Sequence, residues 1–171
     1  MSRTIWEREY YENGQLWYET PYVNGYKHGV QKIYYKSGCL HRLVIYVNGQ
    51  KHGIEEWYSK NGQLWCEVPY TNGQKHGVEK TYYPNGQLQF ESSWLYGQKH
   101  GAERKYYENG KLWCEILYIN NKAHGVQKIY HEDRTTFQEI YYWKGKRISK
   151  RKWKTIPRLT KVLYKFANAN T

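Results

Sequence analysis

A pattern of 24 residues recurs along the chain, without an insertion or a deletion, from residue 5 to residue 148. It contains two motifs, one of the form Asn-Gly-x-Leu and one of the form Lys-His-Gly. The first begins at Asn13, Ser37, Asn61, Asn85 and Asn109, and the second begins at Lys27, Lys51, Lys75, Lys99 and, in a degenerate copy, Ala123. A constant period means that each unit packs on its neighbour in the same way. The sequence therefore predicts a repeat array rather than a globular domain.

The core of this array is predicted to be aromatic. The chain contains 20 Tyr and 8 Trp, and each aromatic side chain can bury about 150–250 Å². Disordered chains are poor in aromatic residues, so the composition indicates a folded protein. We expect the core to be formed by a repeat position that is Tyr in every unit, namely Tyr10, Tyr34, Tyr58, Tyr82, Tyr106 and Tyr130.

Each unit is predicted to be one β-hairpin. In the unit that begins at Gly53, the segments 53–58 and 63–70 are rich in β-prone residues, and Asn61-Gly62 between them is a hairpin turn signal. The segment 72–77 is predicted to be a longer turn into the next unit. Glycine-containing turns occur too often to leave room for helices. The sequence therefore predicts an all-β fold, an elongated single-sheet solenoid of about six antiparallel hairpins over residues 5–148.

The sequence leaves two pairings open within each hairpin. A two-residue loop would place Arg8 opposite Glu19, and the equivalent residues of other units would form similar pairs of opposite charge. A three-residue loop closed by a glycine bulge would gather the steadiest apolar positions on one face, and it suits Pro84 at the second position of its turn. We favour the three-residue loop, because burying one face outweighs exposed ion pairs.

These motifs resemble those of a known repeat family. The run Tyr22–Gly29 (YVNGYKHG) and its copies resemble the MORN repeat (membrane occupation and recognition nexus). The Tyr-Tyr-x-Asn-Gly-x-Leu runs at 10–16 and 106–112 are similar to the variant MORN subfamily, which is found in bacteria and large DNA viruses. The resemblance covers nearly all of residues 5–148. It implies an elongated hairpin array that acts as a scaffold or docking surface, often self-associates, and carries out no catalysis.

The recurring histidines do not predict a metal site. One repeat position is held by His28, His52, His76, His100 and His124. Successive copies should lie about 9–10 Å apart, whereas zinc needs its ligands about 2 Å from one ion. We expect these imidazoles to bond turn carbonyls or stack on aromatic rings. No nucleophile elbow, phosphate-binding loop or Cys-x-x-Cys motif occurs, so we predict no catalytic residue, no metal and no cofactor.

A second, interrupted aromatic ladder is predicted to be an exposed contact surface. Trp17, Trp65 and Trp113 hold one repeat position, and Phe137 holds it in the last unit. Tryptophan is enriched at protein interfaces and often dominates their binding energy. These four residues are therefore the candidate interaction surface of the array.

The net charge of +12 is concentrated in a C-terminal tail, residues 149–171. Residues 140–171 hold ten Lys or Arg and no Asp or Glu, which leaves 17 basic and 15 acidic residues in 1–139. A short amphipathic helix is predicted at about 157–167, with apolar residues at i, i+3, i+4 and i+7. It could cap the last strand, dock on another protein or lie on an anionic surface. The candidate docking residues are Lys150, Arg151, Lys152, Lys154, Arg158, Leu159, Lys161, Val162, Leu163, Lys165 and Phe166.

Together these features predict a non-enzymatic scaffold that binds other proteins or copies of itself, for example as a component of a viral particle. The alternative is a peripheral protein that binds an anionic membrane or nucleic acid through the tail alone. We expect no small-molecule substrate. Three Cys are too few for a disulfide framework, no apolar run is long enough to span a membrane, and the N-terminus lacks a signal-peptide pattern. The expected location is intracellular or inside a viral particle, neither secreted nor transmembrane.

Overall fold

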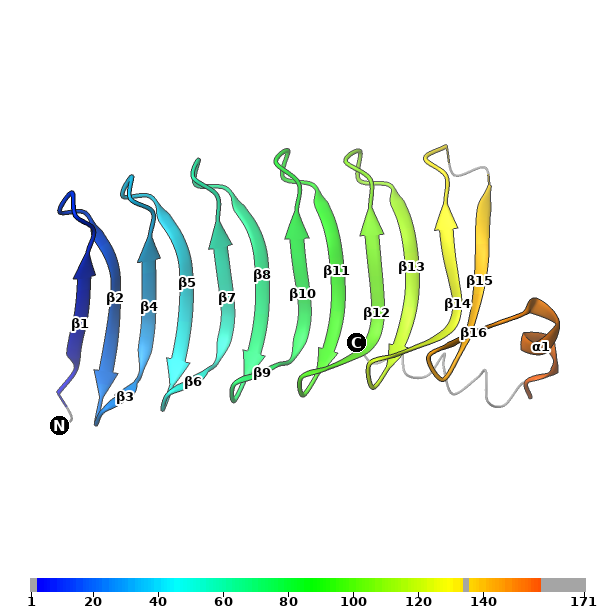
Figure 1. The fold of residues 1–171 in the computed structure, drawn as a ribbon, viewed down its shortest axis with the longest axis horizontal. Coiled ribbons are helices and arrows are strands. Elements are labelled where there is room, and N and C mark those ends of the chain that lie inside the picture. Colours follow the sequence, from blue (N-terminus) through cyan, green and yellow to red (C-terminus); the bar gives the residue numbers. More distant parts are fainter. Residues whose placement is uncertain (1–2, 134–135, 158–171) are drawn as a thin grey trace. The chain divides into compact units, whose positions relative to one another are not determined.

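The computed structural model describes residues 3–133 and 136–157, and the chain divides into two compact units, Met1–Gly86 and Gln87–Thr171. The strands of the N-terminal unit are β1 (Ile5–Tyr10), β2 (Leu16–Val23), β3 (Tyr26–Lys27), β4 (Gly29–Tyr34), β5 (Leu40–Val47), β6 (Gln50–Lys51), β7 (Gly53–Tyr58), β8 (Leu64–Thr71), β9 (Gln74–Lys75) and β10 (Gly77–Tyr82). Their order is β1-β2-β4-β5-β7-β8-β10, all antiparallel, and the short strands β3, β6 and β9 pair with β2, β5 and β8 (Figure 1).

The C-terminal unit repeats this arrangement and ends in a helix. Its elements are β11 (Leu88–Leu95), β12 (Gln98–Tyr106), β13 (Leu112–Ile119), β14 (Lys122–Tyr130), β15 (Phe137–Trp143), β16 (Lys146–Ile148) and α1 (Lys150–Thr155). The strands are antiparallel neighbours in sequence order. The prediction of an all-β array of antiparallel hairpins with a short C-terminal helix is confirmed.

The first three hairpins turn through the three-residue loop that the sequence favoured. In the first copy, the Tyr11 N–H donates to the Gln15 carbonyl at 2.8 Å and the Gly14 N–H donates to the Tyr11 carbonyl at 2.9 Å. Gly14 closes the loop with φ +81°, a backbone conformation that other residues adopt only at a cost. The copies at Tyr35 and Ser59 repeat the same pair of bonds.

Beyond the turn, however, the strands pair in the other register. Tyr10 lies opposite Leu16 but Glu9 lies opposite Tyr18, so Trp17 is an extra residue between them. This second bulge shifts the pairing by one residue and places Arg8 opposite Glu19. The expectation that the loop alone sets the register was wrong, because it did not include this bulge.

The connection between hairpins also differs from the predicted long turn. Asn72 and Gly73 have φ +50° and +79°, the conformation of a two-residue hairpin turn, and Gln74 and Lys75 pair back onto β8. The irregularity follows this turn, where the His76 N–H donates to the Pro69 carbonyl at 3.0 Å. Each Lys-His-Gly motif is therefore a bulge that leads a strand from one hairpin into the next.

Hydrogen bonds between equivalent residues hold successive hairpins at a constant step. The Tyr11 hydroxyl donates to the Tyr34 carbonyl at 2.8 Å, and the Tyr35 hydroxyl donates to the Tyr58 carbonyl at 2.8 Å. At the opposite end of the hairpins, the Gly49 N–H donates to the Lys27 carbonyl at 2.8 Å. Such bonds connect residues 22 or 23 apart in sequence, so an insertion in any unit would break them.

The sheet of each unit is a single layer, and its core is correspondingly thin. Side-chain alternation gives the sheet of each compact unit two faces. We call one the lysine face, which carries Lys27, Lys51 and Lys75 in the N-terminal unit and Lys99 in the C-terminal unit. We call the other the tyrosine face, which carries Tyr34, Tyr58 and Tyr82 in the N-terminal unit and Tyr106 and Tyr130 in the C-terminal unit. Of the deeply buried residues, Val44, Glu55 and Val68 lie on the lysine face. The tyrosine ladder is only half-buried and Tyr10 is 59% exposed, so the prediction that it forms the core was wrong. A single layer has no second layer to cover it.

The structure contains a helix that the sequence did not predict. It spans Lys150–Thr155, in the basic stretch before the predicted helix at 157–167, which falls almost entirely outside the described residues. The Ser149 hydroxyl accepts a hydrogen bond from the Lys152 N–H at 3.2 Å and so begins the helix.

Candidate functional site

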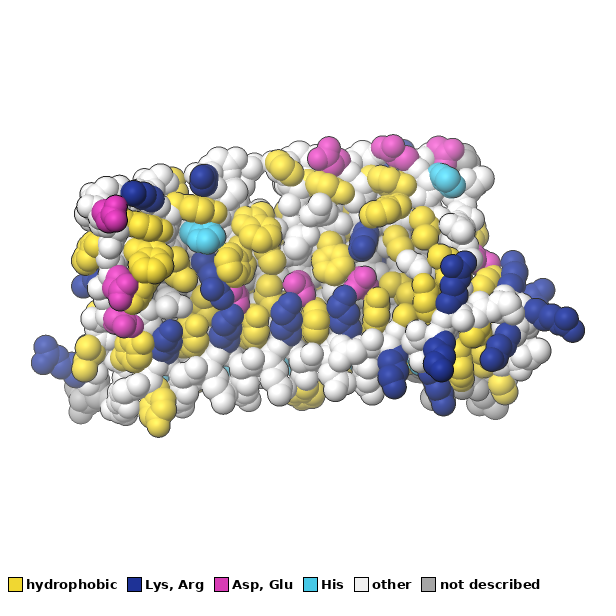
Figure 2. Space-filling view, in the orientation of Figure 1, with side chains coloured by type: hydrophobic (Ala, Val, Ile, Leu, Met, Phe, Trp, Pro, Cys, Tyr) yellow, Lys and Arg dark blue, Asp and Glu magenta, His cyan; other side chains and the backbone are white. Residues whose placement is uncertain are grey.

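The lysine face carries a ladder of lysines that contact aromatic rings or, where Glu follows four residues later, a carboxylate. The Lys27 Nζ lies 5.3 Å from the centre of the Tyr46 ring, and the Lys51 Nζ lies 4.7 Å from that of Tyr70. Lys51 also pairs with Glu55 at 2.6 Å. In Figure 2, which shows this face, dark blue basic side chains alternate with yellow hydrophobic ones. The lysines are thus held by their neighbours in each repeat.

Glu55 is the most buried charge on this face, with 3% exposure. It is paired with Arg42 on one side and Lys51 on the other, and the Arg42 guanidinium lies 4.2 Å from the centre of the Trp57 ring. Burial, followed by the Glu55 charge, raises the pKa of the Tyr70 phenol to about 12. A buried carboxylate with two cationic partners is satisfied, so this cluster has the chemistry of a structural ion network.

The tyrosine face carries hydroxyl–carboxylate bonds at the repeat spacing. The Tyr58 hydroxyl donates to Glu56 at 2.7 Å and the Tyr82 hydroxyl donates to Glu67 at 2.5 Å. The bond to Glu56, with burial, raises the pKa of Tyr58 to about 12. Glu56 and Glu67 lie directly opposite each other, and neither forms an ion pair within residues 3–133 and 136–157.

The same face of the N-terminal unit also carries an apolar strip beside these carboxylates. Cross-strand pairs and side-chain alternation place Trp6, Pro21, Val30, Ile45, Ile54, Pro69 and Val78 in one row. Trp6 is 46% exposed, Ile54 45% and Val78 38%. We call this row the apolar strip. Glu56, Glu67 and Lys80, which lies opposite Glu67, flank the strip, so this part of the face is amphipathic and carries a net charge of −1.

The tryptophans predicted as an interaction surface occupy the bulges. Trp17 and Trp65 of the N-terminal unit are each 42% exposed, and Trp113 of the C-terminal unit is 41% exposed. The Trp65 ring lies 6.0 Å from that of Trp57 on the lysine face. Their partial exposure follows from the bulge, because the extra residue is not flanked by a cross-strand partner.

Phe137 does not share this environment. It lies directly opposite Tyr130 without a bulge, so its side chain is on the tyrosine face of the C-terminal unit, where it is 52% exposed. The turn before it lacks the Asn-Gly motif and reads Asp133-Arg134. The structure therefore brings Trp17 and Trp65 into one kind of site and Phe137 into another.

The first part of the predicted tail docks on β15. The Lys150 ammonium lies 3.5 Å from Glu139, and the Trp153 ring lies 6.0 Å from that of Tyr141. The Tyr141 hydroxyl also donates to Glu139, which lowers the pKa of this carboxyl, as does Lys150. Arg151, Lys152 and Lys154 of α1 are exposed. Arg158, Leu159, Lys161, Val162, Leu163, Lys165 and Phe166 lie outside the described residues.

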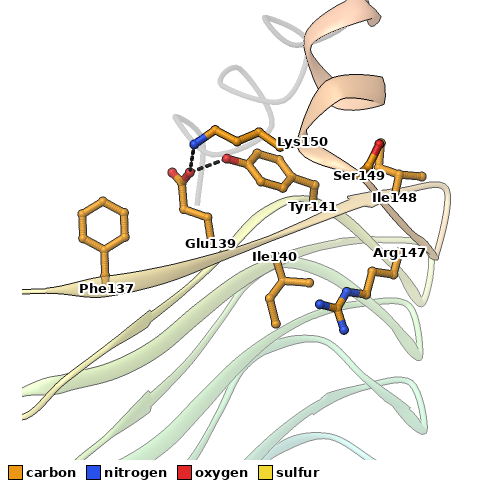
Figure 3. A pocket seen from close by; sticks show the side chains of 8 residues that line it. All are labelled: Phe137, Glu139, Ile140, Tyr141, Arg147, Ile148, Ser149 and Lys150. Carbon is orange, nitrogen blue, oxygen red and sulfur yellow. Dashed lines mark hydrogen bonds and ion pairs between the residues drawn. The ribbon is translucent and has the colours of Figure 1, made fainter.

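A hollow of about 700 Å³ adjoins this contact, lined by residues of β15, β16 and the start of α1 (Figure 3). Phe137, Glu139 and Tyr141 point to the same side of β15 as α1, whereas Ile140 points away (Figure 3). The titratable groups Glu139, Tyr141 and Lys150 are bonded to one another. This arrangement holds the helix on the sheet.

Histidines of the repeat contact neighbouring turns or rings, although His28 and His100 contact an asparagine side chain rather than the expected carbonyl. The His28 Nδ1 lies 3.3 Å from the Asn48 Oδ1 of the next turn, and His100 makes the equivalent contact with Asn120 at 3.2 Å. His124 stacks on Trp143 with ring centres 5.4 Å apart. Among residues 3–133 and 136–157, no three His, Cys, Asp or Glu side chains lie close enough to hold a metal ion.

Sequence reasoning missed the lysine–tyrosine stacking and the amphipathic tyrosine face. The lysine–tyrosine stacking could have been found in the sequence, since Tyr22, Tyr46 and Tyr70 recur with the same period as Lys27 and Lys51. The composition of the tyrosine face could not, because it depends on the strand register, which the bulges at Trp17 and Trp65 shift by one residue. An error of one residue moves a side chain to the other face of a sheet.

Comparison with protein families agrees with this architecture. The model of the MORN repeat variant matches residues 7–24, 27–48, 51–72, 75–95 and 99–120, which together are more than half of the chain. A comparison with curated proteins finds no match. None of the helices in the described residues is long and apolar enough to cross a membrane. The hairpin repeats and the matched segments show that the chain belongs to the MORN repeat variant family.

Proposed function

We propose that this protein is a non-enzymatic scaffold that binds other protein chains or copies of itself. MORN repeats are commonly scaffold or binding modules. The observation that carries the proposal is the exposure of large aromatic side chains at a repeated position, with Trp17 and Trp65 each 42% exposed on the N-terminal sheet. Partly exposed tryptophans on a rigid strand are suited to anchor a partner.

A role as one component of a larger assembly, such as a viral particle, is consistent with this proposal. The units expose both faces of a single-layer sheet, and β1 is exposed along its whole length. Exposed edge strands favour pairing with another chain. The open faces and the exposed edge strand therefore support assembly through the sheet.

Cross-linking mass spectrometry with the purified full chain, alone and in extract of its source, tests this function. The wild-type protein is expected to form defined cross-links, to a partner or to itself, that Trp17→Ala combined with Trp65→Ala reduces. The matched control is Tyr26→Ala, which removes an aromatic side chain that is 62% exposed in β3. A wild type that forms no cross-links, or cross-links that both variants retain in full, would contradict the proposal.

A peripheral protein that binds anionic membrane or nucleic acid is the second candidate. It is favoured by the exposed Arg151, Lys152 and Lys154 on α1, because binding to polyanions scales with the number of cationic contacts. Such binding would weaken steeply as salt is added, and Arg151→Gln with Lys154→Gln would reduce the salt dependence. Binding of anionic vesicles or single-stranded DNA that is insensitive to salt would contradict it.

A further inference from the structure

The apolar strip of the N-terminal unit is an open surface with a defined chemistry. Ile54 and Val78 are 45% and 38% exposed, and Pro69 lies opposite Ile54. Beside this row, Glu56 and Glu67 oppose each other and accept hydrogen bonds from tyrosines. Lys80 lies opposite Glu67 on the same face, so these three side chains carry a net charge of −1, which favours a further cation. The surface is thus complementary to a segment that is both apolar and basic.

The C-terminal unit shows how a surface of this kind is covered. Tyr141 continues the equivalent row there, since it lies opposite Val126, and Glu139 is its neighbour on the same face. Helix α1 places the Trp153 ring on Tyr141 and the Lys150 ammonium beside Glu139 (Figure 3). Tyr141 is only 8% exposed as a result. In the C-terminal unit, a basic helix with one aromatic contact therefore covers the part of the sheet that carries Tyr141 and Glu139.

The chain contains a second segment with the same chemistry. Residues 158–166 carry four apolar side chains at i, i+3, i+4 and i+7, interleaved with basic ones, and no acidic residue follows Glu139. The net charge of this segment is opposite in sign to that of the Glu56–Glu67 pair.

We propose that the apolar strip and the Glu56–Glu67 pair of one molecule receive segment 158–167 of a second copy. Each molecule offers one strip and one segment, so two copies can satisfy each other in a closed dimer with two equivalent contacts. This inference rests on the proposed self-association and specifies its surface. In the dimer, the basic side chains of the segment lie on Glu56 and Glu67, and its apolar side chains lie on Ile54, Pro69 and Val78.

Sedimentation equilibrium of the full chain, over a range of concentrations at low salt, tests the proposal. The wild type is expected to show a monomer–dimer equilibrium. Glu56→Lys with Glu67→Lys is expected to weaken the dimer by at least about tenfold, and so is Lys161→Glu with Lys165→Glu. Combining all four changes restores opposite charges, so the dimer should return to within a few-fold of the wild type. Restoration separates pairing from a loss of folding.

Two controls address position and apolar contact. Glu12→Lys reverses a charge in an exposed turn and should leave the dimer unchanged. Ile54→Ser should weaken it, whereas Ile5→Ser, at a residue that is 65% exposed on the lysine face, should not. A dimer that ignores the Glu56 and Glu67 reversals, or that the combined variant fails to restore, overturns the proposal.

A wild type that stays monomeric also overturns the proposed docking. If that monomer still forms cross-links to another protein through Trp17 and Trp65, the scaffold function stands and only the self-docking falls. If the monomer forms none, both fall. The two experiments together therefore distinguish failure of the dimer surface from failure of the function.

Discussion

Single glycines at the Lys-His-Gly bulges allow one hairpin to pass into the next. Gly77 has φ +110°, and a Cβ at this position would lie 3.1 Å from the Pro69 Cγ across the strands. Gly62, in the Asn-Gly turn, has φ +82°, and a Cβ there would meet nothing within 4 Å. Both need a backbone that favours glycine, but only the bulge also needs the space.

Alanine substitutions at Gly62 and Gly77 therefore separate the need for a positive φ from the need for space at Cβ. Gly62→Ala is expected to lower the free energy of unfolding by about 1 kcal/mol, the cost of a left-handed alanine. Gly77→Ala adds the clash with Pro69 and is expected to lower it by about 2–3 kcal/mol. Urea denaturation of both variants measures the difference. Equal losses would show that Pro69 moves aside without cost and that the close approach has no role.

The three cysteines are expected to differ in reactivity. Cys39 is exposed, whereas Cys66 and Cys114 are buried, and burial raises the pKa of the Cys66 thiol to about 11. Since the thiolate is the reactive form, iodoacetamide at pH 8 should label Cys39 alone in the native protein and all three in urea. Peptide mapping by mass spectrometry reads this out. Rapid native labelling of Cys66 would mean that the lysine face is not packed as described.

At the scale of elements, the two-residue turns between hairpins depend on residues that accept positive φ. Asn24, Asn48 and Asn72 occupy the first turn position with φ near +50°, which asparagine tolerates better than most residues. Tyr96 occupies the equivalent position in the C-terminal unit with φ +47°. A bulky side chain in this conformation is strained.

Replacing this tyrosine by the residue found in the other turns should stabilise the protein. Tyr96→Asn is expected to raise the free energy of unfolding by about 0.5–1 kcal/mol. Tyr26→Asn is the control, because Tyr26 is similarly exposed, at 62% against 65%, but lies in β3 rather than in the turn. Thermal and urea unfolding compare the two. A loss of stability in Tyr96→Asn would show that contacts of the ring exceed the backbone strain.

The tyrosine–glutamate bonds predict how stability depends on pH. Tyr58 and Tyr106 have pKa values raised from 10.0 to about 12, Tyr58 chiefly by its bond to Glu56 and Tyr106 chiefly by burial. The folded state therefore favours the protonated phenol, and this contribution is complete below pH 10. It should be lost as pH rises from 10 through about 12.

Denaturation at pH 8, 10 and 11 measures this loss. Tyr58→Phe with Tyr106→Phe should reduce the fall in unfolding free energy between pH 10 and 11, whereas Tyr26→Phe should not. If the unfolding free energy falls by the same amount in the wild type and in both variants, other groups cause the alkaline loss of stability.

The sequence predicts an element well when a local motif determines it, and poorly when the pairing of distant segments determines it. The period and the Asn-Gly turns are local signals, and they predicted the hairpins and the three-residue loops correctly. The bulge at Trp17 has no local signal, because it reflects how two strands match their rows of side chains. Without it, the expected register placed residues on the wrong face, and the apolar strip could not be recognised.

The helix illustrates the same limit. Lys150–Lys154 has four charges and no apolar periodicity, so periodicity favoured the more amphipathic segment that follows. Helix α1 instead depends on the Ser149 cap and on the contact of Trp153 with Tyr141. The cap was readable from the sequence, but the contact required the position of β15.

At the scale of the whole molecule, successive hairpins make equivalent contacts. Hairpins β1–β2, β4–β5 and β7–β8 share the same turn bonds and the same bulged strand register. A chain of this kind gains its stability from contacts between adjacent units. Its binding surfaces are consequently rows of side chains that extend from one hairpin to the next.

The pairing of β8 with β10, which belong to successive hairpins, tests this claim most directly. Thr81 lies opposite Cys66 in this register, and Lys80 lies opposite Glu67. Directly opposed residues in antiparallel strands have Cα atoms about 4.5–5.5 Å apart, within the range of a disulfide. Mild oxidation of dilute Thr81→Cys, followed by peptide mapping, should therefore yield an intramolecular disulfide between the new thiol and Cys66. Lys80→Cys should yield none, and a disulfide in Lys80→Cys but not in Thr81→Cys would contradict the register on which every surface described above depends.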